Sequence, residues 1–89
     1  MKDPRYSTIH GLLKLGHINK FTDIFQYIPY TVLAAEYNTN HPRMKKMTQD
    51  PALWTLAEIY HLADLIEYNQ KKLALMAVEE VEQMKKGGK

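Results

Sequence analysis

The chain has 89 residues, enough for one small hydrophobic core, and its 45% hydrophobic and 25% charged residues are typical of a globular domain. Cysteine is absent, which excludes disulfides, zinc thiolate sites and thiol nucleophiles and is typical of a reducing compartment. No apolar run approaches the roughly 20 residues of a membrane helix and the amino end lacks the apolar segment of a signal peptide, so we expect a cytoplasmic protein with no membrane partner.

Two interpretations are open for the N-terminal stretch, residues 1–17. Its apolar residues are Ile9, Leu12, Leu13 and Leu15. They fit either a short helix between Gly11 and Gly16 or an irregular arm.

Residues 18–28 carry apolar side chains at spacings of three and four, the pattern of one helical stripe. These side chains are Ile18, Phe21, Ile24, Phe25 and Ile28. Proline disfavours helical geometry in the residue before it, so Pro29 ends this predicted helix near Ile28 and opens the next one with almost no loop.

The next two predicted helices are short, residues 30–37 and 41–49, and a three-residue turn joins them. Asn38 tolerates left-handed backbone geometry and therefore suits the end of the first helix. Pro42 suits the first turn of the second helix, whose end is marked by Gln49-Asp50-Pro51.

Thr55-Leu56-Ala57-Glu58 has the T-x-x-E form of a capping box and predicts a helix start. The apolar stripe continues to Ile66, Tyr68-Asn69 interrupt it, and a last helix runs from about Gln70 into Met84. No strand pattern or internal repeat is present, so the predicted class is all-α, a compact bundle of about five helices.

The two short helices meet the demands of a helix-turn-helix in one register. The small residue Ala34 stands where the helices cross, and Asn38 follows it by four places, as the turn requires. Apolar residues flank the crossing: Leu33, Tyr37, Met44 and Met47. At about 100° per residue, inward methionines place Pro42, Lys45, Lys46 and Gln49 on the opposite side of helix 41–49, with His41 and Arg43 at its rims.

This outward side is basic. Residues 39–50 carry a net charge of +2, against +1 for residues 1–38 and −1 for residues 51–89. Lys and Gln side chains read base edges in the major groove and Arg holds phosphate, so the surface suits double-stranded DNA.

From Leu33-Ala34 through Met44-Lys45-Lys46-Met47 to Leu62-Ala63 and Leu73, the chain resembles the helix-turn-helix domain of the phage lambda repressor and Cro family, also called the XRE family. The resemblance covers residues 18–76, and the helix-turn-helix motif lies at residues 30–49. Residues 1–17 are then an N-terminal extension or short helix. Residues 77–89 are the end of the C-terminal helix and a flexible tail. The resemblance implies a lambda repressor-like DNA-binding domain and transcriptional regulator, commonly a two-fold homodimer, with helix 41–49 in the major groove. The implied base contacts are Asn40, His41, Pro42, Lys45, Lys46 and Gln49, and the implied phosphate contacts are Tyr30, Thr31 and Arg43.

Two further expectations concern protein partners. The modest net charge of +2 favours an alternative function, a protein-interaction module such as an antitoxin-like or adaptor subunit with the same helical fold.

The last helix is longer than the bundle needs, and its distal half either forms a homodimer or folds back on the Leu12–Leu15 stretch. Its apolar residues are Leu73, Met76, Ala77, Val81 and Met84.

Catalysis is not expected. Ser7 is the only serine, and the four histidines are spread over four segments without the spacing of a metal site. His61 and Asp64 one turn later are explained by a surface helix pair. We therefore expect no enzymatic activity, no metal, no cofactor and no small-molecule substrate.

Overall fold

The computed structural model describes residues 3–87, and in this part of the chain the protein is all-α, as predicted, with no strand. Five α-helices and two 3-10 helices follow one another in this order: α1 (Arg5–Lys14), η1 (Phe21–Gln26), α2 (Tyr30–Glu36), α3 (His41–Gln49), η2 (Pro51–Leu53), α4 (Leu56–Ile66) and α5 (Gln70–Gly87). Residues 88–89 of the predicted tail lie outside the described residues.

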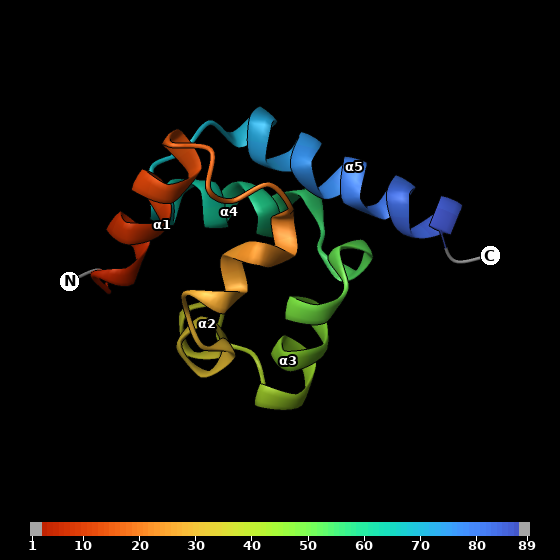
Figure 1. The fold of residues 1–89 in the computed structure, drawn as a ribbon. Helices are drawn as coiled ribbons and strands as arrows, with labels where there is room; N and C mark the ends of the chain where they lie inside the picture. The colour runs from red at the N-terminus through yellow and green to blue at the C-terminus, as the bar shows by residue number, and fades with distance from the viewer. Residues whose placement is uncertain (1–2, 88–89) are drawn as a thin grey trace.

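Helix α4 packs against α1 and α5, while α2 and α3 pack against each other. In Figure 1, α1 and α5 flank α4 in the upper part of the view, and α2 and α3 lie below. Helix α4 contributes five buried side chains to the core: Ile59, Leu62, Ala63, Leu65 and Ile66. The pair α2 and α3 therefore forms one end of the molecule, away from α5.

The N-terminal stretch is helical, but the helix is longer than the one expected between Gly11 and Gly16. Helix α1 spans residues 5–14, passes through Gly11 and ends before Gly16, whose φ of 78° is readily adopted by glycine. It buries side chains at spacings of three and four: Tyr6, Ile9 and Leu13. His10 Nδ1 lies 3.0 Å from the carbonyl oxygen of Ile66, which joins α1 to the end of α4.

The α-helix predicted over residues 18–28 is wrong in type and extent, because the structure has the six-residue 3-10 helix η1 there. The backbone is extended at Lys20, whose amide donates to the Asp23 carboxylate at 3.2 Å and so fixes the start at the next residue. Pro29 restricts the backbone at the other end, which leaves room for a short element only. A 3-10 helix aligns residues three apart, and Phe21 and Ile24 are accordingly both fully buried.

The predicted capping box at the start of α4 is confirmed. The Glu58 amide donates to Thr55 Oγ1 at 3.1 Å, and the Thr55 amide donates to Glu58 Oε1 at 2.8 Å. At the other end of α4, Glu67 adopts a left-handed φ of 55°, and the Tyr68 amide donates to the carbonyl of Ala63 at 2.9 Å. Both ends of α4 are thus satisfied by local hydrogen bonds.

Helix α5 begins at Gln70, as predicted, and continues three residues past Met84 to Gly87. It packs against α4, η1 and η2. Leu15, in the stretch on which one of the two alternatives folded this helix back, is 73% exposed. Glu80 ties α5 to η1, because its carboxylate accepts the Thr22 amide at 2.9 Å and the Thr22 hydroxyl at 2.5 Å. The distal part of α5 is therefore anchored within its own chain as far as Glu80.

Candidate nucleic-acid interface

The crossing of α2 and α3 has the predicted inner face. Leu33 and Ala34 of α2 and Met44 and Met47 of α3 are all at most 1% exposed. Asn38 adopts a φ of 53°, the left-handed conformation expected for the turn. The turn and the buried face together fix which side of α3 faces solvent.

Tyr37, at the end of α2, connects the crossing to α4. Its hydroxyl donates to the carbonyl oxygen of Glu58 at 2.8 Å, and its ring meets the rings of His61 and Trp54 edge-on at 4.9 and 5.7 Å between centroids. Burial raises the pKa of Tyr37 well above its ordinary value, with smaller contributions from Tyr6 and two glutamates. The side chain is therefore a neutral hydrogen-bond donor that holds α2 against α4.

The start of α3 is capped by Asn40, one of the predicted base contacts. Its side-chain oxygen accepts the Arg43 amide at 2.8 Å, and Pro42 occupies the first turn. The cap uses the acceptor of the Asn40 amide group, so the part that can contact DNA is its NH2, which donates.

The end of α3 is held by Trp54. The indole Nε1 donates to the carbonyl of Met47 at 2.7 Å, and the same carbonyl accepts the Asp50 amide at 3.3 Å, so the last turn of the helix is held by two donors. The indole stacks on Phe25, with 5.3 Å between centroids and 13° between planes, and meets Phe21 edge-on at 5.2 Å. Helix α3 is thus fixed at both ends as well as along its buried face.

The outward face of α3 carries six of the residues implied by the resemblance. All six are exposed: His41, Pro42, Arg43, Lys45, Lys46 and Gln49. Within residues 3–87, no ion pair joins Lys45 or Lys46 to a carboxylate. The structure therefore gathers these residues on one surface and leaves both lysine charges uncompensated.

Arg43 differs from the two lysines because it has partners within the chain. Its Nη2 lies 3.2 Å from Glu58 Oε2, and its Nη1 lies 3.4 Å from the Thr39 hydroxyl. Partial burial alone would raise the pKa of Glu58, but hydrogen bonds from Thr55 and Arg43 outweigh it and hold this pKa below the ordinary value. The arginine is oriented, and its charge is largely balanced.

The two predicted phosphate contacts on α2 lie in different surroundings. The ring of Tyr30 meets the ring of His41 edge-on, with 6.1 Å between centroids, and so joins the first turns of α2 and α3. Thr31 lies in a groove with the carboxylates of Asp3 and Glu36, which repel a phosphate group. The structure thus brings Tyr30, but not Thr31, into the surface formed by α3.

One exposed residue of this surface was missed in the sequence. Leu53, in η2, is 47% exposed and lines a depression of about 290 Å³ together with Arg43, Lys46 and Met47. The only signal was its position after Asp50-Pro51, where a turn presents side chains outward. Leu53 adds an apolar contact beside Lys46.

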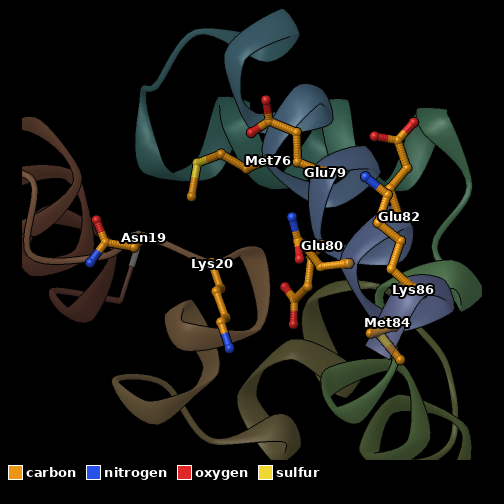
Figure 2. Close-up of a pocket in the computed structure, with 9 residues that line it drawn as sticks. Asn19, Lys20, Met76, Glu79, Glu80, Glu82, Met84 and Lys86 are labelled. Carbon is orange, nitrogen blue, oxygen red and sulfur yellow. The ribbon is translucent and has the colours of Figure 1, made fainter. Parts of the chain in front are cut away.

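A larger crevice, of about 540 Å³, lies between α5 and the segment before η1 (Figure 2). Asn19 and Lys20 line one side, and residues of α5 that include Met76, Glu79 and Glu80 line the other. Glu80 is already bonded to Thr22, and neither histidine nor serine is among the residues that line the crevice.

The ionisable side chains that could support other chemistry have structural partners. His61 Nε2 lies 3.5 Å from Glu36 Oε2, and Asp64 accepts a hydrogen bond from Gln70 at 2.9 Å. Across residues 3–87, no group of three or more His, Cys, Asp or Glu side chains is arranged to hold a metal ion.

In comparisons with known proteins, no family model matches this chain, and no curated protein or solved structure matches it either. In the described part of the chain, no helix combines the length and the apolar character needed to cross a membrane.

Proposed function

We propose that the protein binds double-stranded DNA in a sequence-specific manner and acts as a small transcriptional regulator, with α3 in the major groove. One observation carries this proposal: an exposed face with two uncompensated lysines and a glutamine stands on a helix that is fixed at both ends. A rigid helix of this kind presents its donors to base edges at a low cost in conformational entropy.

The dimensions agree with the proposed site. An α-helix with its side chains is about 10–12 Å across and fits a major groove about 12 Å wide, and the nine residues of α3 extend over about 13 Å along it. Lys45, Lys46 and Gln49 supply base-directed donors, while His41 and the Asn40 amide stand at the end of α3 that lies beside α2. In this proposal the Tyr30 hydroxyl contacts the sugar-phosphate backbone.

Charge supports the same orientation. Residues 39–50 carry a net charge of +2, and the acidic residues Glu79, Glu80 and Glu82 lie on a different helix from the two lysines, which favours the approach of a polyanion to α3. Arg43 contributes less than a free cation because Glu58 balances it. We therefore expect moderate affinity from one protomer and a clear dependence on salt.

The experiment compares purified wild type with the double variant Lys45→Ala/Lys46→Ala in selections from a random duplex library at two salt concentrations. The matched control is Lys85→Ala/Lys86→Ala, which removes the same charge from an exposed pair at the far end of α5. Wild type and control should enrich the same short site. The α3 variant should lose enrichment and about two units of the salt slope. Equal binding by all three proteins would overturn the proposal.

One observation favours a protein-interaction module instead, namely the exposed Leu53 beside Lys46. A protein partner would bury this leucine, whereas DNA binding through α3 depends mainly on the lysines. If wild type enriches no sequence and shows no salt-dependent binding to DNA, this second function replaces the first.

A further inference from the structure

The depression between α3 and η2 lies beside a turn whose backbone is held in place. The Leu53 amide donates to the carbonyl of Asp50 at 3.2 Å, and the Trp54 amide donates to the carbonyl of Pro51 at 3.3 Å. Pro51 and Trp54 are both buried, whereas Leu53 is 47% exposed. Leu53 is therefore an exposed leucine on a fixed backbone, and its position relative to α3 is defined.

The opposite wall of the depression comes from one side of α3. Arg43, Lys46 and Met47 lie within about 100° of one another around the helix and line the depression together with Leu53. Met47 is only 1% exposed and closes the bottom. The Arg43 guanidinium is held 3.2 Å from Glu58, so the part of Arg43 that lines the depression is its methylene chain. The depression is thus mainly apolar inside.

The charge beside the depression belongs to Lys46, which also stands on the outward face of α3. Within residues 3–87, no ion pair joins this lysine to a carboxylate. A ligand that fits the depression is therefore part of an anion and carries a small apolar group. In the major groove, thymine alone presents a methyl group, and lysine bonds to O6 and N7 of guanine.

We propose that Leu53 reads the C5 methyl group of a thymine that lies next to the guanine contacted by Lys46. The inference rests on the proposed DNA binding and names part of the sequence that the protein prefers, a thymine beside a guanine. Leu53 covers the methyl group from η2, and Met47 and the Arg43 methylenes cover it from α3. Because this contact is apolar, its contribution should change little with salt, unlike that of the lysines.

The experiment replaces the thymines of the selected duplex one at a time by deoxyuridine, which removes the methyl group and keeps the base pair. Binding is measured by fluorescence anisotropy at two salt concentrations. For wild type, one thymine beside a guanine should be sensitive, and its replacement should weaken binding about four-fold, as expected for one buried carbon group. This factor should be the same at both salt concentrations.

Two variants assign the effect to Leu53. Leu53→Ala should bind the thymine duplex more weakly than wild type does and should no longer distinguish it from the deoxyuridine duplex. Leu56→Ala is the matched control, because Leu56 is 59% exposed but does not line the depression. This control should keep the four-fold difference. Circular dichroism checks that both variants remain folded.

Several results would overturn the inference while DNA binding itself stands. They are a selected site without thymine, a set of deoxyuridine duplexes that all bind as the parent does, and a four-fold difference that persists in Leu53→Ala. Each would leave Leu53 to a protein partner. A wild type that selects no site and shows no salt-dependent binding would instead overturn the proposed function and this inference together.

Discussion

The guanidinium of Arg43 lies 3.2 Å from the carboxylate of Glu58, so the rim cation of α3 is held by the helix that follows it. The other oxygen of the same carboxylate accepts the Thr55 amide and closes the capping box of α4. One side chain therefore caps α4 and anchors α3. Because it faces the proposed DNA surface, it also limits how much positive charge that surface presents.

Replacing this glutamate should strengthen DNA binding. Glu58→Gln keeps a side chain that can cap the helix but removes the negative charge, which frees Arg43 for a phosphate. We expect a three- to ten-fold gain in affinity at low salt and a salt slope steeper by about one unit, measured by fluorescence anisotropy on a labelled duplex. Glu36→Gln is the control for net charge, and an equal gain from both variants would count against a role for Arg43.

The same carboxylate should make stability depend on pH. The pKa of Glu58 is lowered in the folded state, so its ionised form stabilises the protein above the ordinary glutamate pKa of about 4.3. This contribution is lost as the pH falls through that value towards the lower folded pKa. Urea unfolding of wild type and Glu58→Gln over this range should show a shallower acid slope for the variant, and identical slopes would contradict the assignment.

Tyr6, which is buried, and Tyr37, which is partly buried, should respond in opposite ways to loss of the hydroxyl. The Tyr6 hydroxyl is buried without a hydrogen-bond partner, and burial is the main cause that raises the pKa of Tyr6 to about 12. Tyr6→Phe should therefore raise the free energy of unfolding by about 1 kcal/mol. Tyr37→Phe removes the bond to the Glu58 carbonyl and should lower it by about 1 kcal/mol. Chemical denaturation measures both, and a change of the same sign in both variants would refute this reading.

The bond between Thr22 and Glu80 should hold η1 in place. Glu80→Ala leaves the Thr22 amide and hydroxyl without their acceptor and should destabilise the fold by about 1.5 to 3 kcal/mol, the range for bonds to a charged group. Hydrogen exchange of the Thr22 amide should become faster. Gln83→Ala, an exposed neighbour on α5, should leave both quantities unchanged.

Features governed by local rules were predictable from the sequence. The left-handed turn at Asn38 and the capping box at Thr55 depend on residues within four positions of each other, and both are present. The solvent face of α3 followed from its two methionines and the helical repeat. These elements define the candidate surface without any knowledge of the rest of the fold.

Features that depend on distant residues were not predictable. Apolar residues at spacings of three and four do not distinguish a short 3-10 helix from an α-helix, so the sequence did not indicate the helix type of η1. The acceptor of the Thr22 amide, Glu80, lies 58 residues away along the chain, so this bond could not be predicted either. Glu67 adopts left-handed geometry although its residue type seldom does. Arg43 pairs with Glu58, 15 residues further along the chain, and this pair depends on how α3 and α4 pack against each other.

Trp54 is the only tryptophan in the chain, and its indole donates to the carbonyl at the end of α3. The protein therefore contains its own fluorophore at the base of the proposed DNA-contacting helix. Any motion that lifts α3 would break this bond, admit water to the ring and shift its emission to longer wavelength. Tryptophan emission can thus report whether α3 is in contact with Trp54 in unlabelled protein, separately from unfolding of the whole domain.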